Sequence, residues 1–137
     1  MTMSRTAALL LAILLAAPPA LAQAPLQPRT MGGIAYVSGG ISIEERNAIK
    51  AMEAGYDLRL LFSARDTGEY LWGVKVRIMD GGDKTLLSAV SDGPYFLAKL
   101  PPGRYTIEVE DEGRAIRKSI EVSPGRPVAE HFTWPSA

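Results

Sequence analysis

The chain has 137 residues, with 15 basic and 15 acidic side chains, one histidine and no cysteine. Its length is that of a single domain, and its zero formal net charge removes the electrostatic basis for nucleic-acid binding, which needs a basic face. The absence of cysteine excludes disulfides, thiolate zinc sites and cysteine nucleophiles. With one histidine as well, we expect no metal site and no cofactor.

Residues 1–22, MTMSRTAALLLAILLAAPPALA, have the organisation of a secretory signal peptide. Arg5 provides the positive n-region, and residues 7–17 form the apolar segment. The small residues of Ala20-Leu21-Ala22 fit a cleavage site, so we predict cleavage after Ala22. An uncleaved anchor is the alternative, but the apolar segment is shorter than the about 20 residues that span a bilayer.

The leader is of the short, Ala/Leu-rich bacterial kind, which predicts a periplasmic location. Loss of Arg5 leaves a mature chain with 14 basic and 15 acidic residues, a formal charge of −1. No later stretch is long and apolar enough to cross a membrane. We therefore expect a processed protein without a transmembrane span.

The mature chain is predicted to begin with a linker and then form one domain over residues 34–137. Residues 23–33 contain prolines and show no periodicity, which is typical of a linker. Residues 34–37 form a short apolar run between glycine pairs, a weak strand signal.

One helix is expected near the start of this domain. Ser42 and Glu45 have the spacing of a capping box, in which each side chain binds the other residue's backbone amide. The apolar face that follows consists of Ala48, Ile49 and Met52. Gly55 is a natural C-terminal stop, so the helix is predicted over about 43–54.

From Tyr56 onward the hydrophobic period changes from 3.6 to 2, which indicates strands. The predicted strands cover residues 56–63, 71–79, 84–90, 95–98, 105–110, 114–122 and 127–134. The turn Asp80-Gly81-Gly82-Asp83 predicts a hairpin between the second and third of these. About seven short strands separated by frequent turns favour a mainly β fold, an antiparallel β-sandwich with the helix as an appendage.

Residues 91–109, SDGPYFLAKLPPGRYTIEV, resemble the carboxypeptidase regulatory-like domain family, which has a transthyretin-like (prealbumin-like) sandwich. The matching positions are Asp92, Gly93, Tyr95, Leu100, Pro101, Pro102, Gly103 and Tyr105. The resemblance covers about 57–122, and the N-terminal part resembles small proteobacterial periplasmic proteins with one such domain. It implies an accessory or adhesive module, with a fold that carbohydrate-binding domains share.

The residues of this motif are expected to have structural roles. Pro101 and Pro102 lack amide donors and so end a strand. Gly103 is expected to close the turn with a positive φ angle. Tyr105 can bury its ring while its hydroxyl reaches a backbone partner. None of them is a nucleophile or a base.

His131 is the only imidazole, and it is predicted on the last strand, partly exposed and without an orienting partner. The transthyretin-like hydroxyisourate hydrolases carry several active-site histidines and end in Tyr-Arg-Gly-Ser, whereas this chain ends in HFTWPSA. The aspartates Asp80, Asp83 and Asp92 lack the ligand number and spacing of a calcium loop, so they are assigned to turns. No catalytic or metal residue is predicted.

Aromatic side chains are the weak candidates for ligand binding, since their faces can stack on sugar rings. Trp134, Tyr36 and Tyr95 are put forward, with Trp134 expected to be exposed near the C-terminus. Tyr70 and Trp72 share the period-2 face of Val74 and are expected to be buried. The acidic residues 108–112 face basic residues 114–118 across a turn, which predicts cross-strand ion pairs.

These features favour an exported, non-enzymatic accessory or interaction module of the bacterial periplasm. A carbohydrate-binding module for envelope glycan or peptidoglycan is the alternative, and a small hydrolase is a third. The expected partner is a periplasmic or envelope protein, or a glycan, and not a nucleic acid.

Overall fold

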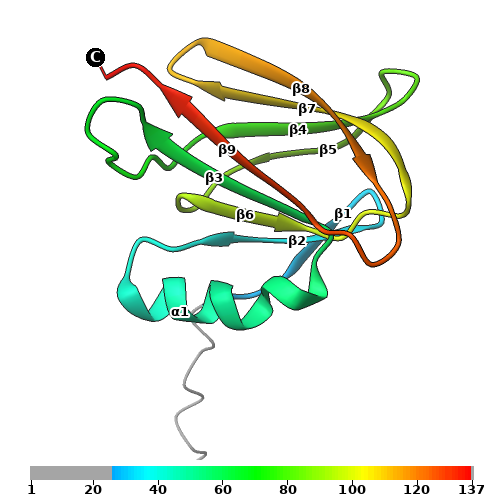
Figure 1. Cartoon of the computed structure of the whole chain (residues 1–137), viewed down its shortest axis with the longest axis horizontal. Helices are drawn as coiled ribbons and strands as arrows, with labels where there is room; N and C mark the ends of the chain where they lie inside the picture. The colour runs from blue at the N-terminus through cyan, green and yellow to red at the C-terminus, as the bar shows by residue number, and fades with distance from the viewer. Residues whose placement is uncertain (1–25, 137) are drawn as a thin grey trace, which may run out of the picture.

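Within residues 26–136, which the computed structural model describes, nine strands form two sheets that face each other (Figure 1). The strands are β1 (Arg29–Met31), β2 (Ile34–Gly39), β3 (Leu58–Ala64), β4 (Lys75–Asp80), β5 (Thr85–Val90), β6 (Tyr95–Ala98), β7 (Gly103–Asp111), β8 (Arg114–Val122) and β9 (Val128–Trp134). The first sheet has the order β1-β2-β6-β3-β9 and the second β5-β4-β7-β8. This confirms the predicted mainly β sandwich. The predicted signal peptide, 1–22, lies outside the described residues.

Two strands precede the predicted set. The weak signal at 34–37 belongs to β2, and β1 lies inside residues 23–33, which were expected to form a linker. β1 pairs with β2 in antiparallel register from Arg29↔Tyr36 to Met31↔Ile34, with Gly32 and Gly33 forming the turn. The prediction missed β1 because three exposed residues carry no hydrophobic alternation.

The predicted hairpin at Asp80–Asp83 is confirmed, and the predicted turn at Glu112-Gly113 joins a second one. β4 pairs with β5 around the Asp80–Asp83 turn, where the Asp80 carboxylate accepts hydrogen bonds from the amides of Gly82 (2.9 Å) and Lys84 (3.0 Å). β7 pairs with β8 over their whole length, from Gly103↔Val122 to Asp111↔Arg114. The Asp80 carboxylate therefore binds the backbone of the turn, and Asp83 adopts a left-handed φ of 61°, so both act as turn residues, as expected.

One strand pair departs from the antiparallel pattern. β9 runs parallel to β3, in register from Leu58↔Val128 to Ala64↔Trp134. The other six pairs of the described chain are antiparallel. The segment between β8 and β9 crosses from one sheet to the other, and the amide of Val128 donates to the carbonyl of Asp57 (2.7 Å) at the start of the parallel pair.

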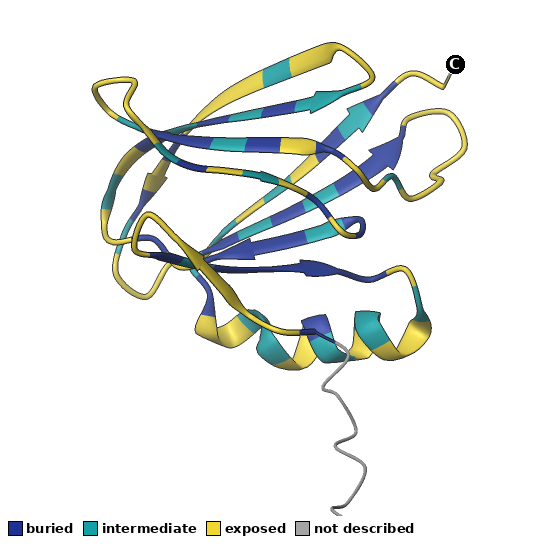
Figure 2. Ribbon diagram, turned by 180° about the vertical axis from the view of Figure 1, so that it is seen from behind, coloured by how far each residue is buried: buried dark blue, intermediate teal, exposed yellow. Residues whose placement is uncertain are grey.

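The main core lies between the two sheets and is visible as dark blue stripes that alternate with exposed positions along the strands (Figure 2). Its most buried members include Leu58, Leu60, Phe62, Val76, Ile78, Leu87, Phe96, Ile107 and Val109. Burial of each large apolar side chain contributes about 1.5–3 kcal/mol before entropy is subtracted. The period-2 pattern from Tyr56 onward encodes this layer.

Helix α1 (Ile43–Met52), continued by the 3₁₀ turn η1 (Glu53–Gly55), packs on the outer face of the first sheet (Figure 1). Ile49 enters a second apolar cluster with Val37 of β2 and Leu97 of β6. The start of the helix agrees with the prediction, and its regular part ends two residues early. Neither helix within 26–136 has the length and apolar character that crossing a bilayer requires.

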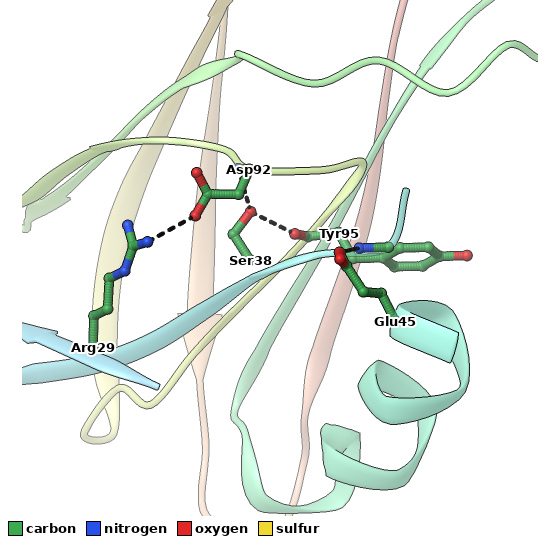
Figure 3. Close-up of polar contacts among 6 residues, drawn as sticks. Arg29, Ser38, Glu45, Asp92 and Tyr95 are labelled. Atoms are coloured by element: carbon green, nitrogen blue, oxygen red, sulfur yellow. Dashed lines mark hydrogen bonds and ion pairs between the residues drawn. The ribbon is translucent and has the colours of Figure 1, made fainter. Parts of the chain in front are cut away.

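The helix N-terminus departs in one detail from the predicted capping box. The Ser42 hydroxyl accepts a hydrogen bond from the amide of Glu45 (3.1 Å), as expected. The Glu45 carboxylate accepts instead from the amide of Gly40 (3.1 Å), two residues before Ser42 (Figure 3). Glu45 therefore fixes the approach of β2 to the helix.

Candidate functional site

The Asp92-Gly93-x-Tyr95 segment holds β2 against the turn before β6 (Figure 3). The Ser38 hydroxyl accepts a hydrogen bond from the amide of Asp92 and donates one to the carbonyl of Tyr95, both at 2.9 Å. The Asp92 carboxylate forms an exposed ion pair with Arg29 of β1 (3.4 Å). These contacts give the segment a structural role.

The Leu100-Pro101-Pro102-Gly103-x-Tyr105 segment is also structural. Tyr105 is buried, and its hydroxyl donates to the carbonyl of Pro101 (2.6 Å), which confirms the predicted backbone partner. The amide of Leu100 donates to the carboxylate of Asp57 (3.0 Å). Gly103 has the expected positive φ, +158°, a value that residues with side chains rarely adopt, and it is the first residue of β7.

Two of the three aromatic candidates are buried. Trp134, expected to be exposed, is only 2% exposed, because β9 runs beside β3 and places the indole between the sheets against Phe62. Its Nε1 donates to the carbonyl of Arg114 (3.0 Å). Tyr36 is 6% exposed and stacks on Phe96, with ring centroids 5.3 Å apart. Neither ring can serve as a binding platform.

Tyr95, the third candidate, is half-buried on the outer face of the first sheet. Its ring lies 6.0 Å from that of Tyr70, and the Arg46 guanidinium lies 5.5 Å from the centre of the Tyr70 ring. Burial, with the neighbouring Tyr70 hydroxyl, raises the pKa of Tyr95 to about 12. Tyr95 is therefore protonated at neutral pH and packs as a neutral side chain.

The exposed large aromatics are the two that were expected to be buried. Trp72 is 61% exposed and Tyr70 37%. The predicted strand over 71–79 begins only at Lys75, since Gly73 adopts a φ of +72° and ends the alternation before it. Tyr70 keeps one isolated bridge to Ser63, and Trp72 lies in the loop.

These aromatics line a surface hollow of about 380 Å³ at one end of the sandwich, which we call the Trp72 hollow. Three segments build it: the β3–β4 loop, the β7–β8 turn and the chain after β9, which lie at the same end of the molecule (Figure 1). Its main lining residues are Glu69, Tyr70, Trp72, Asp111, Glu112 and Arg114. A concave site with mixed aromatic and polar lining is the usual form of a ligand site.

The charges in the Trp72 hollow are predominantly acidic. Arg114 is held by two contacts, with one guanidinium nitrogen donating to the carbonyl of Pro135 (3.0 Å) and another 4.0 Å from the Asp111 carboxylate. Burial raises the pKa of Asp111, the charge of Glu112 raises it further, and Arg114 opposes both. Glu69 and Glu112 are exposed and form no ion pair within the described part of the chain.

A second feature, missed from the sequence, joins β3 to β9. The Ser63 hydroxyl lies 2.6 Å from Nε2 of His131, whereas His131 was expected to have no partner. The parallel register, with Ser63 opposite Thr133, brings the two side chains together diagonally. His131 was expected to be partly exposed, and its side chain is exposed. It borders a groove of about 280 Å³ with Arg59 and Tyr95.

Serine and histidine can act as nucleophile and base, but within the described part of the chain the Ser63–His131 pair lacks the access and the orienting partner that such a pair needs. Ser63 is only 4% exposed, so a substrate has little access to its hydroxyl. Within residues 26–136, no carboxylate hydrogen-bonds to His131 to orient its ring. The same residues contain no group of three potential ligands that could hold a metal ion. The contact is best explained as a link between the two strands.

The fold and the site together define a mainly β sandwich with an aromatic and acidic hollow on its surface. No protein-family model matches the chain. Over 65 residues it is 29% identical to the tRNA U34 carboxymethyltransferase of Proteus mirabilis (strain HI4320), a match that covers 47% of this chain and 20% of that protein. The chain thus spans about a fifth of that relative, and this similarity assigns no family.

Among solved structures, the chain is similar to BcpA*(D312A), the major pilin subunit of Bacillus cereus. The similarity covers 56% of this chain and 28% of the pilin chain, at 14% sequence identity and a TM-score of 0.45. At these values no functional conclusion follows.

Proposed function

We propose that the mature protein is an exported, non-enzymatic accessory or interaction module of the bacterial periplasm, of the carboxypeptidase regulatory-like kind. The observation that carries the proposal is the position of Trp72, 61% exposed beside a hollow of about 380 Å³. Tryptophan is enriched among the residues that dominate binding energy in protein interfaces, and a large aromatic left in water costs solvation free energy. Its exposure here favours a role in binding.

The scaffold supports this role. The Trp72 hollow is built on the ends of paired strands, and Ser136 is held there by a hydrogen bond from its amide to the Asp66 carboxylate (3.2 Å). Segments anchored in this way present a preformed surface, which lowers the entropic cost of binding.

The binding role can be tested by site-specific photo-crosslinking in the producing bacterium. A photoreactive phenylalanine analogue at position 72 should yield a crosslinked species of higher mass, because it would lie against the partner. The matched control is position 121, where Glu121 is exposed at the end of β8 opposite Arg114 of the hollow. Absence of a crosslink at 72, or the same crosslinks from both positions, would contradict the proposal.

Export needs a separate test, because residues 1–22 lie outside the described structure. Cell fractionation followed by N-terminal sequencing should find a periplasmic species that begins at Gln23. A full-length product retained in the membrane would refute the predicted cleavage after Ala22.

Carbohydrate binding is the second candidate, favoured by the exposed indole face next to carboxylates that can accept hydrogen bonds from hydroxyl groups. The platform is then Trp72 with Tyr70, and not the buried Trp134 and Tyr36. A glycan array probed with residues 23–137 tests it, and silence across envelope glycans and peptidoglycan fragments would remove this candidate.

A hydrolase would have to use the Ser63–His131 contact. A screen with generic ester and amide substrates should show no turnover that depends on these residues. Turnover by the wild-type protein that disappears in the His131→Ala variant would overturn the non-enzymatic proposal.

A further inference from the structure

We infer that the Trp72 hollow binds a positively charged side chain, lysine or arginine, from an extended segment of a partner polypeptide. The inference rests on the proposed binding function and names the chemistry of the group that the hollow takes. Three observations carry it: the free indole, the charge balance of the lining, and the mixture of apolar and acidic surface.

The first observation concerns the exposed aromatic rings. The described chain places its own cations over two tyrosines: Arg46 lies over Tyr70 at 5.5 Å, and Lys99 lies over Tyr56 at 5.3 Å. Within the same residues no lysine or arginine lies over Trp72, although its side chain is the most exposed of these rings. Tryptophan is the best cation-binding ring of the three aromatic types. Its face is therefore available to a cation from another molecule.

The second observation is the charge balance. The lining contains three carboxylates, Glu69, Asp111 and Glu112, against the single guanidinium of Arg114. The Arg114 guanidinium already contacts the carbonyl of Pro135 and the carboxylate of Asp111. A neutral glycan would leave the excess negative charge of the hollow uncompensated, whereas an ammonium or guanidinium group would neutralise part of it.

The state of Asp111 agrees with this charge argument. Burial raises the pKa of its carboxyl group, and the nearby Glu112 adds to the effect. Burial and Glu112 thus disfavour the ionised form of Asp111 more than Arg114 favours it. A bound cation would supply that charge and lower the pKa again.

The third observation distinguishes a side chain from a small free ammonium ion. Leu71 and Pro135 give the hollow an apolar part next to its carboxylates. Lysine and arginine can lay their methylene stems on such a surface while their charged heads reach acidic groups. A polypeptide segment also provides flanking residues to cover the rest of the hollow, which a single ammonium ion leaves open.

The test uses the mature protein, which contains two tryptophans and hence two indole N–H signals in a ¹⁵N–¹H spectrum. Trp72→Phe assigns the signal of Trp72. The probes are a short capped glycine peptide with two lysines, the same peptide with both lysines acetylated, 1,5-diaminopentane and chitotetraose. We expect the lysine peptide to shift the Trp72 signal saturably, and acetylation to weaken binding at least about tenfold, because it removes the charge.

Substitutions locate the interaction. Trp72→Ala should weaken binding of the lysine peptide by about threefold to thirtyfold, which is the range of a cation–aromatic contact. Because this variant lacks the indole signal, its binding is followed by the backbone amide signals of Glu112 and Arg114, which line the hollow. The double change Glu69→Gln and Glu112→Gln should weaken it comparably and reduce its dependence on salt. The matched control is Glu121→Gln, an exposed carboxylate at the opposite end of β8, which should leave binding unchanged.

Each contrary outcome has a distinct meaning. Equal binding of the acetylated peptide, or preferential binding of chitotetraose, would overturn the cationic ligand while leaving the binding module in place. Equal binding of 1,5-diaminopentane would overturn the polypeptide source. No shift of Trp72 with any probe, together with a specific crosslink at position 72, would also refute the inference alone. Failure of the crosslink would refute the proposed function itself.

Discussion

Gly93 lies directly against the backbone of Gly39, at the point where the turn before β6 meets the end of β2. A Cβ atom on Gly93 would fall 2.2 Å from the carbonyl carbon of Gly39 and 2.3 Å from its oxygen. The Ser38 hydroxyl, bound to both Asp92 and Tyr95, fastens the same junction. Backbone therefore packs on backbone here, and that contact explains the glycine of the Asp-Gly-x-Tyr segment better than any conformational need.

The first prediction follows from this contact. Gly93→Ala should lower the free energy of unfolding by about 1–3 kcal/mol, because the backbones must separate to admit the methyl group. Gly55→Ala is the matched control, since a Cβ there meets no atom within 4 Å, and its effect should stay within about 1 kcal/mol. Urea denaturation measures both. Equal stability of the Gly93→Ala variant and the wild type would refute the packing of Gly93 on Gly39.

The second prediction concerns the hydroxyl of Tyr105. Tyr105→Phe should destabilise the fold by about 1 kcal/mol, because it removes the 2.6 Å hydrogen bond to Pro101 and leaves that carbonyl without this donor. Tyr36→Phe is the control: Tyr36 is equally buried, and its hydroxyl forms no hydrogen bond to a side chain or backbone of the described residues. A larger loss from Tyr36→Phe than from Tyr105→Phe would contradict this assignment.

Local signals predicted the parts of the fold that depend on neighbours in the chain. Ser42 and Glu45 marked the start of α1, and the Asp80–Asp83 turn marked a hairpin, because both depend on residues within a few positions. The ion pairs across the β7–β8 turn were also predictable, and Glu108–Arg117 and Asp111–Arg114 confirm them. Lys118 is different: it pairs with Glu130 of the other sheet.

The candidate site could not be predicted because it depends on long-range pairing. Trp72 was expected to be buried but is exposed, because Gly73 adopts a left-handed conformation and the strand begins only after it. Trp134 was expected to be exposed but is buried, because β9 pairs in parallel with β3. Hydrophobic alternation reports which residues share a face, but not which neighbouring strand covers it. The Ser63–His131 contact was missed for the same reason, since the two residues meet only through that pairing.

The third prediction separates the two tryptophans by fluorescence. In a Trp134→Phe variant the remaining Trp72 should emit at long wavelength and be quenched efficiently by iodide, because water surrounds its ring. In a Trp72→Phe variant the remaining Trp134 should emit at shorter wavelength and resist quenching. Trp134→Phe should also be the less stable variant, because it removes core contacts and the hydrogen bond to Arg114. Efficient quenching of Trp134 would show that β9 is not paired as described.

The last prediction concerns Glu108, which lies between two arginines on the outer face of the second sheet. Arg117 of β8 hydrogen-bonds one carboxylate oxygen, and Arg77 of β4 lies 2.8 Å from the other. The hydrogen bond from Arg117 lowers the pKa of Glu108 below its ordinary value of 4.5, burial opposes this shift, and the charges of both arginines add to it. The folded state therefore binds a proton at Glu108 less readily than the unfolded chain.

A carboxyl group of this kind stabilises the fold at neutral pH and loses that contribution as the pH falls through its lowered folded value. The wild type should accordingly be more stable than Glu108→Gln at pH 7, by a modest margin because the pairs are partly exposed to water. The difference should shrink once the pH falls below about 4.5 and should vanish in stronger acid. Thermal unfolding of both proteins between pH 7 and pH 2.5 measures it, with Glu121→Gln as the exposed control. A stability difference that stays constant over this range would mean that the two arginines do not hold Glu108 in its ionised form.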